Sequence, residues 1–127
     1  MRVVQIATKD LRSCAIEIAL KSDNVEIHTY PPDKDAYFFV SDLMPTAVLA
    51  SSLTVLKQLP EALEKYPGIK KVPFFFILNH QDYLELESFV AQNSKNNWPP
   101  FYHLTLPVAP MVLKNQILQI LQNNHKS

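Results

Sequence analysis

The chain has 127 residues with 12 basic and 12 acidic side chains, so its formal net charge is zero. This length suits one domain with a single core, and the balanced charge argues against a nucleic-acid surface, which normally shows a basic excess. The single cysteine, Cys14, excludes an intramolecular disulfide and is typical of a reducing, cytoplasmic compartment. The chain turns polar at Thr8, and no apolar run reaches the roughly 18 residues of a membrane span. We therefore expect neither a signal peptide nor membrane attachment.

Glycine is almost absent, with Gly68 alone against ten prolines. Glycine is the residue that allows backbone to approach a phosphate closely, so one glycine cannot build a P-loop or a G-x-G-x-x-G turn. The four histidines show no metal-ligand spacing and have no cysteine near them. We expect no nucleotide cofactor bound through those motifs and no metal site.

The N-terminal third reads as strand, helix, strand. Residues 3–7 form a short β-branched run that suits a buried strand, and Asp10 can cap the helix that follows. Residues 25–30 alternate apolar and polar side chains as a second strand does. The helix between them has apolar residues at i, i+3, i+4, i+7 and i+8, which predicts that its core face comprises Leu11, Cys14, Ala15, Ile18 and Ala19.

Residues 31–52 allow two interpretations. In the first, Pro32 and the acidic residues after it start a helix over residues 35–43, and residues 46–50 are the third strand. In the second, residues 36–41 are that strand, because aromatic residues favour strands, and Asp42 ends it. We favour the first, which leaves room for a helix between the second and third strands.

The remaining elements alternate regularly. We expect a helix in part of 53–66, with Pro60 tolerable only near its start, and a stop at Pro67-Gly68. The continuously apolar segment 72–78 predicts a central strand covered on both faces. A helix at 81–92, a polar loop at 93–100, a strand at 101–106 and a helix at 109–122 complete the chain. Five strands alternating with helices predict an α/β fold, with a parallel sheet and helices on both faces.

Three segments resemble response-regulator receiver domains of the CheY-like family. They are the first strand and helix (residues 3–19), LEKYPGIKKVPFFFIL (63–78), and LTLPVAPMVLKNQILQIL (104–121). The resemblance is one of pattern over nearly the whole chain. It implies a (βα)5 flavodoxin-like fold with the strand order 2-1-3-4-5. The chain would then be a single receiver-like domain, either a short adaptor or the N-terminal domain of a longer regulator.

The resemblance also implies where phosphorylation residues would lie. Receivers hold Mg²⁺ with two acidic residues after strand 1, phosphorylate an Asp after strand 3, and complete the pocket with a Thr or Ser after strand 4 and a Lys before a proline after strand 5. A hard cation needs carboxylate oxygens, and a phosphoryl group needs countercharge. This sequence has none of the expected residue types there, since the corresponding positions hold Ala7, Thr8, Ser51, Leu78 and Leu106. It therefore predicts a degenerate receiver, or pseudo-receiver, that lacks phosphorylation chemistry.

The phosphoacceptor position depends on the two interpretations of residues 31–52. Ser51 lies 44 residues after Ala7, close to the usual receiver spacing. Asp42 lies 35 residues after Ala7 and begins Asp42-Leu43-Met44-Pro45, which looks like the family's D-x-M-P turn. An atypical receiver phosphorylated on Asp42 therefore stays open as an alternative. We interpret Asp10 as a helix cap and Cys14 as a buried core residue.

The predicted function is protein contact in signalling, not catalysis. Met111, Val112 and Leu118 lie outside the expected core stripe of the last helix, and exposed apolar residues in a row suggest a protein contact. His103 lies three residues before Leu106, the place where receivers carry an aromatic switch residue. We expect these four residues to contact a kinase, a regulator, an output domain or a second copy, through the face formed by the fourth helix, fifth strand and fifth helix.

A small flavodoxin-like enzyme or cofactor binder is the alternative from another class. It would need a polar pocket at the carboxyl ends of the strands, where this sequence offers Thr8, Ser51, Asn79 and the Leu106-Pro107 turn. Trp98 is either a binding aromatic or a lid on its own domain.

Overall fold

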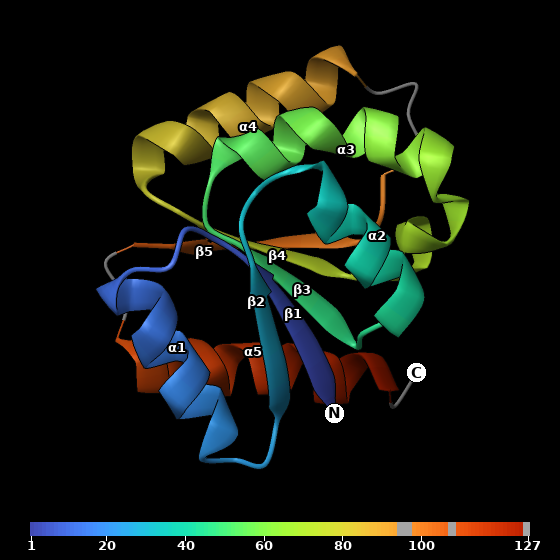
Figure 1. Cartoon of the computed structure of the whole chain (residues 1–127). Coiled ribbons are helices and arrows are strands. Elements are labelled where there is room, and N and C mark those ends of the chain that lie inside the picture. Colours follow the sequence, from blue (N-terminus) through green and yellow to red (C-terminus); the bar gives the residue numbers. More distant parts are fainter. Residues whose placement is uncertain (94–97, 107–108, 126–127) are drawn as a thin grey trace.

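Three layers make up the domain, with a twisted parallel sheet between two layers of helices (Figure 1). The computed structural model describes residues 1–93, 98–106 and 109–125, without the side chains of residues 34 and 123–125. The strand order is β2-β1-β3-β4-β5, as the sequence predicts. The strands are β1 (Arg2–Ile6), β2 (Glu26–Tyr30), β3 (Ala47–Ala50), β4 (Phe74–Leu78) and β5 (Phe101–Thr105).

The helices divide between the two faces of the sheet. In Figure 1, α2, α3 and α4 lie above the sheet, and α1 and α5 lie side by side below it. A short 3₁₀ helix over Pro67–Lys71 follows α3, where the sequence predicts a stop. The helices are α1 (Leu11–Lys21), α2 (Lys34–Leu43), α3 (Leu53–Lys65), α4 (His80–Gln92) and α5 (Pro110–His125).

A hydrophobic core lies on each face of the sheet, and β4 supplies side chains to both of them, since all five of its residues are buried. Phe74, Phe76 and Leu78 pack against α2, α3 and α4, and Phe75 and Ile77 pack against α1 and α5. A strand covered on both faces has no solvent side, which explains why its sequence does not alternate.

The structure confirms the first interpretation of residues 31–52. The side chain of Asp33 accepts a hydrogen bond from the Asp35 amide and caps α2, and Met44 ends the helix in the left-handed conformation (φ 44°). β3 then pairs with β1 and β4 in the middle of the sheet. The strand propensity of the aromatic residues is overridden because Ala36, Tyr37 and Val40 share one buried face of the helix.

The predicted core face of α1 is wrong except for Ala19, which is buried. Leu11 and Ile18 are 92% and 70% exposed, and Cys14 is only half-buried. The buried side comprises Ser13, Ile16, Ala19 and Leu20. The helix has apolar residues on two sides. The side that faces the core includes a polar residue, Ser13, which a hydrophobic pattern predicts to be exposed.

The predicted limit on Pro60 is also wrong, because this proline is the eighth residue of α3. Its ring nitrogen cannot donate to the carbonyl of Leu56 one turn earlier. The helix nevertheless continues to Lys65, because Leu56, Leu59 and Ala62 are buried against the sheet on one side of it. Burial of this apolar side compensates for the missing hydrogen bond.

Candidate functional site

The carboxyl edge of the sheet, where receivers are phosphorylated, contains a small hollow beside β1 and β3. Thr8 and Ser51 follow these two strands, and the hollow has a volume of about 100 Å³. Its lining is mainly hydroxyl groups with one acid and one base: Ala7, Thr8, Asp10, Arg12, Ser13, Ser51 and Ser52. The Ser52 hydroxyl is buried without a hydrogen-bond partner among the described residues, although Ser52 is the N-cap residue of α3.

Asp10, the single carboxylate of this hollow, caps α1, as the sequence predicts. Its Oδ1 accepts a hydrogen bond from the Ser13 amide at 2.8 Å, and the Ser13 hydroxyl accepts one from the Asp10 amide at 2.9 Å. The Ser13 amide, followed by the Ser13 hydroxyl and the Arg12 charge, lowers the pKa of the Asp10 carboxyl. One carboxylate that already caps a helix is a poor ligand set for Mg²⁺, which prefers several oxygen ligands.

The other two predicted phosphorylation positions are apolar. Leu78 ends β4 and is 1% exposed, and half-buried Leu106 donates its backbone amide to the Leu78 carbonyl at 2.9 Å. Asn79 caps α4 by accepting from the Asp82 amide, and it is not among the residues that line the hollow. Pro107 lies outside the described residues.

Asp42, the alternative phosphoacceptor, is not at this edge. It is an exposed residue near the end of α2, and it neither ends β3 nor lines the hollow at the carboxyl edge. The position after β3 belongs to Ser51, as the favoured interpretation predicts.

A larger depression, the α4–β5 groove, lies between α4 and the edge strand β5. Its volume is about 420 Å³, and its lining comprises Tyr83, Leu86, Glu87, Val90, Ala91, Phe101 and His103. The His103 ring stacks on the Tyr83 ring with centroids 3.9 Å apart, and Tyr83 donates its hydroxyl hydrogen to Glu87 Oε1. Sequence reasoning missed Glu87 as a partner of Tyr83, although their spacing of four residues on a helix is a signal for such a pair.

The electrostatics of the groove favour a neutral imidazole. Desolvation by burial lowers the pKa of His103, and the charge of His80 lowers it further. The nearby Glu87 carboxylate opposes this shift without reversing it. The Glu87 carboxylate raises the pKa of the Tyr83 phenol because it accepts the phenol's proton in a hydrogen bond. Glu87 carries the only formal charge in the lining of the groove at neutral pH.

The four predicted contact residues do not form one ridge. His103 faces α4, on the opposite side of the sheet from α5. Met111 and Val112 are 53% and 48% exposed on α5, and Leu118 is half-buried against the core below the sheet. Successive side chains of a strand point to opposite faces of the sheet. Leu104 lies in the core on the α5 side, so its neighbour His103 must lie on the α4 side. This period of two was the sequence signal for the position of His103.

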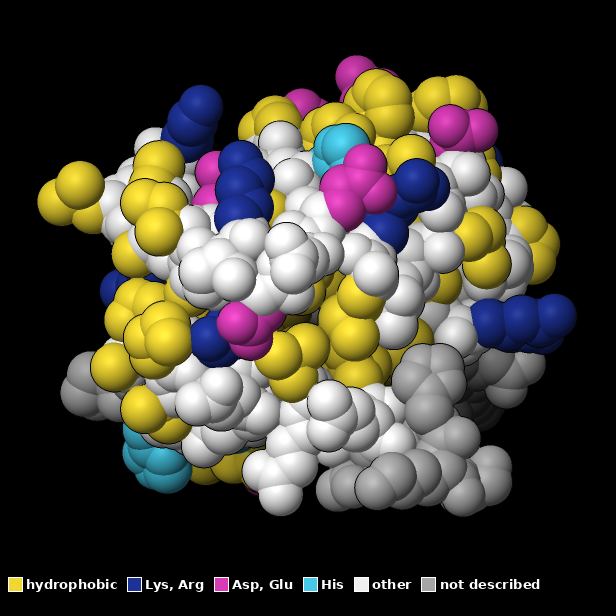
Figure 2. Space-filling view, turned by 90° about the horizontal axis from the view of Figure 1, so that it is seen from below, with side chains coloured by type: hydrophobic (Ala, Val, Ile, Leu, Met, Phe, Trp, Pro, Cys, Tyr) yellow, Lys and Arg dark blue, Asp and Glu magenta, His cyan; other side chains and the backbone are white. Residues whose placement is uncertain are grey.

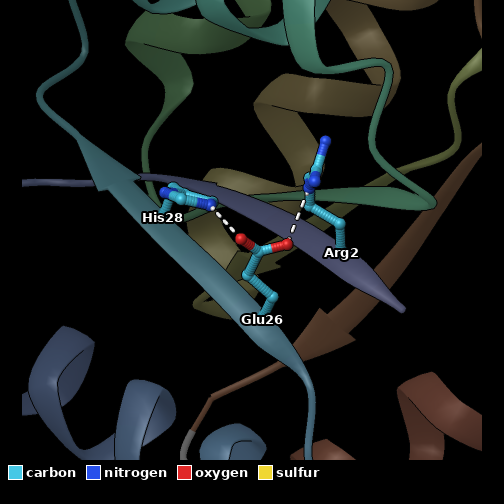
Figure 3. A network of polar contacts seen from close by, with 3 residues as sticks. All are labelled: Arg2, Glu26 and His28. Carbon is cyan, nitrogen blue, oxygen red and sulfur yellow. Dashed lines mark hydrogen bonds and ion pairs between the residues drawn. The ribbon is translucent and has the colours of Figure 1, made fainter.

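The two edges of the sheet differ in charge. On β1 and the edge strand β2, the Glu26 carboxylate lies between Arg2 and His28, with its Oε2 2.8 Å from Arg2 Nε and its Oε1 3.2 Å from His28 Nε2 (Figure 3). The hydrogen bond from Arg2, followed by the close contact with His28, lowers the pKa of Glu26. The opposite edge strand, β5, has the sequence FYHLT and no formally charged residue at neutral pH. Charged side chains protect an edge from pairing, so β5 is the less protected edge.

Trp98 covers its own domain. Its indole Nε1 donates to the Asn93 carbonyl at 3.1 Å, and its ring packs edge-on against Phe89 with centroids 6.0 Å apart. The structure thus supports the lid interpretation. Over the described part of the chain, no helix is long and apolar enough to cross a membrane, and no three His, Cys, Asp or Glu side chains gather as metal ligands.

Comparison with known proteins shows the fold. No family model and no curated protein matches the chain. A solved signal receiver domain of a modulated diguanylate cyclase from Desulfovibrio desulfuricans, described as an example of alternate folding, is 21% identical, with a TM-score of 0.63 over 96% of this chain and 94% of that one. A response regulator protein from Burkholderia multivorans is 13% identical, with a TM-score of 0.63 over 94% and 93%. The chain therefore has the flavodoxin-like fold of response-regulator receiver domains.

Proposed function

We propose that this chain is a pseudo-receiver, a signalling module that acts without phosphorylation by binding another protein through the α4–β5 side of the domain. The observation that carries the proposal is the composition of the carboxyl edge. A receiver-type mechanism needs several carboxylates for a metal, whereas this edge offers a single carboxylate, which caps α1, beside Arg12, hydroxyls and two leucines.

The α4–β5 groove supports protein contact as the mode of action. Phe101 is 37% exposed on an edge strand, and the groove beside it is apolar apart from the polar groups of Tyr83, Glu87 and His103. Interface centres are enriched in aromatic residues and depleted of charge, as this lining is. Because the β2 edge is charged and the β5 edge is not, association at β5 has the lower desolvation cost.

The alternative, a cofactor-binding protein or small enzyme, has less support. The hollow at the carboxyl edge has about 100 Å³, whereas pockets for cofactor-sized ligands have roughly 300–1,000 Å³. The unpartnered Ser52 hydroxyl favours, at most, a ligand of a few atoms there.

The test uses a substitution on the rim of the groove. Ala91→Glu places a long charged side chain at an exposed helical position, so it blocks the groove without disturbing a core. Ser88→Glu is the matched control, because Ser88 is exposed on the side of α4 that faces α3. We expect Ala91→Glu to abolish either self-association in sedimentation or co-purification of the native partner, with Ser88→Glu unchanged. Equal behaviour of the two variants would remove the α4–β5 groove from consideration.

A further inference from the structure

A row of four aromatic rings crosses α2 near the β2 edge of the sheet. The Tyr30 ring, at the end of β2, stacks on the Phe39 ring with centroids 4.4 Å apart. Phe38 packs edge-on 5.5 Å from Phe39, and the Tyr66 ring at the end of α3 lies 6.4 Å from that of Phe38. Phe38 is not part of the core above the sheet and is 51% exposed. Its ring is therefore held by its neighbours and still open to solvent.

Two carboxylates border this exposed ring along α2. Asp35 precedes Phe38 by three residues and Asp42 follows it by four, so the three side chains lie along one side of the helix. The Cα atoms of the two acids are about 10.5 Å apart along the helix axis. Both acids are exposed, and neither carboxylate has an ion-pair partner among the described side chains. We call Asp35, Phe38 and Asp42 the α2 face.

A basic side chain of the domain already lies over one ring of the row. Lys65 Nζ is 5.6 Å from the centre of the Tyr66 ring. A cation within about 6 Å of a ring centre is attracted by the negative charge on the ring's face. No lysine or arginine among the described side chains lies over Phe38 in this way. The α2 face therefore complements a cation that comes from outside the chain.

The opposite layer of helices differs in how its charges are arranged. Figure 2 looks at the layer of α1 and α5, where acidic and basic side chains lie next to one another. Lys114 and Asp23 form an ion pair in that layer, with Nζ 3.2 Å from Oδ2. That pair satisfies both charges within the chain, whereas Asp35 and Asp42 lie unpaired on either side of an exposed ring.

Arginine is the residue that satisfies both components of the α2 face. Its planar guanidinium stacks on an aromatic ring and donates two parallel hydrogen bonds to a carboxylate, whereas the lysine ammonium is a compact, strongly hydrated charge. In a polyproline II segment, every third residue projects from the same side at intervals of about 9.3 Å. This interval is close to the spacing of Asp35 and Asp42. The backbone of such a segment has no internal hydrogen bonds and stays solvated, so it can lie along a helix without leaving polar groups unpaired.

A second copy of this chain does not supply that chemistry. The chain has two arginines, of which Arg2 is paired with Glu26. Arg12 alone cannot reach both carboxylates, and its contact with α2 of another copy would be head-to-tail, which builds rings or filaments. A single-stranded nucleic acid would stack bases on the aromatic row, but Asp35 and Asp42 repel its phosphates.

We propose that the α2 face binds an arginine-rich polyproline II segment of another protein, whose guanidinium groups pair with Asp35 and Asp42 and of which one stacks on Phe38. The α2 face is separate from the α4–β5 groove, because α3 lies between α2 and α4 (Figure 1). The domain can therefore hold two proteins at the same time.

The experiment uses two probe peptides of equal charge. One is a fluorophore-labelled peptide of sequence Arg-Pro-Pro-Arg-Pro-Pro-Arg, and the other has Lys in place of each Arg. By fluorescence anisotropy we expect the Arg peptide to bind at least about threefold more tightly, with an affinity that falls as salt rises. Phe38→Leu keeps an apolar side chain in the helix and should remove this preference for arginine. Asp35→Asn with Asp42→Asn should weaken binding of both peptides at least about fivefold.

A matched control variant lies on α4. Asp82→Asn with Glu85→Gln also removes two negative charges from a helix and should change the affinity for either peptide by less than about twofold. Ala91→Glu should likewise leave peptide binding unchanged, so this test is separate from that of the α4–β5 groove. Thermal unfolding of each variant verifies that the domain is folded.

Several results would overturn the proposal. They are no binding of the Arg peptide, equal binding of the two peptides to the wild type, or equal losses of affinity in the α2 and α4 double variants. Self-association of the wild type in sedimentation that the Asp35/Asp42 variant loses would identify a second copy as the occupant. Tighter binding of oligothymidylate than of the Arg peptide would identify a nucleic acid instead.

Discussion

The ion pair between Lys114 and Asp23 offers a sharp test of how the α1–α5 layer is stabilised. The side chain of Lys114 is 6% exposed and that of Asp23 is 42% exposed, with Nζ and Oδ2 3.2 Å apart. Asp23→Asn keeps the shape of the side chain and removes its charge, which leaves an ammonium group almost buried. Lys114→Met keeps an unbranched side chain that can pack where the lysine stem packs, and it removes the buried charge.

The burial of the two partners sets the expected magnitude. Removing one partner of a fully buried pair costs about 3–5 kcal/mol of unfolding free energy. Water reaches Asp23, so we expect Asp23→Asn to cost less, about 1–2 kcal/mol. Lys114→Met should stay within about 1 kcal/mol of the wild type, because an apolar replacement requires no desolvation of a charge. Once Lys114 is Met, Asp23→Asn should have almost no further effect.

Urea unfolding of the wild type, both single variants and the double variant measures this cycle. For a domain of this size, 1 kcal/mol corresponds to about 3–5 °C in Tm, so a thermal scan gives an independent reading. The reasoning is refuted if Asp23→Asn leaves stability unchanged while Lys114→Met costs more than about 2 kcal/mol. That pattern would mean that the lysine stem packs in a way that methionine cannot reproduce and that its charge needs no partner.

Acetyl phosphate or beryllofluoride with Mg²⁺ should leave the amide resonances around Ser51 unchanged, and a Mg²⁺-dependent shift there would contradict the pseudo-receiver proposal. The lowered pKa of His103 means that the unfolded chain binds its proton more readily, so this residue should reduce stability as pH falls through the unfolded value near 6.5. His103→Phe keeps a ring against Tyr83 and should flatten the stability profile between pH 7 and 5, whereas a profile identical to that of the wild type would exclude His103 as its source. Tyr37→Phe removes the hydroxyl that hydrogen bonds Gln58 at 2.7 Å and should cost about 1 kcal/mol in urea unfolding, and a cost below a few tenths would show that the bond is not needed.

The element types follow from strong local signals, and the strand order was expected from the (βα)5 pattern and the resemblance to receiver domains. The segment over β4 is apolar throughout, and Pro32 with the acidic residues after it predicts the start of α2 despite the aromatic residues of that helix. These patterns predict the elements correctly because burial of one side of a helix or strand requires apolar residues at the period of that element. The favoured position after β3, Ser51, follows from that choice.

The orientation of α1 could not be predicted in the same way. Both of its sides carry apolar residues, and the side that faces the sheet is fixed by contacts distant in sequence. Ser13 is buried because its carbonyl accepts a hydrogen bond from the Gln5 side chain of β1 and its hydroxyl completes the cap. A serine satisfied in this way is invisible to a hydrophobic pattern, and Leu11 and Ile18 consequently pass as core residues.

The position of β4 has a consequence for how the chain is made and kept soluble. The segment Phe74–Leu78 is five consecutive apolar residues without charge or proline, the composition of segments that form cross-β aggregates. Both of its neighbours, β3 and β5, are parallel to it, and 22 residues separate the end of β4 from the start of β5. Parallel pairing over such separations forms slowly, so a nascent chain exposes this segment until β5 and α5 have been synthesised and docked. Truncations within α5 should therefore be seen first as loss of soluble protein in cells, before any loss of binding can be assayed.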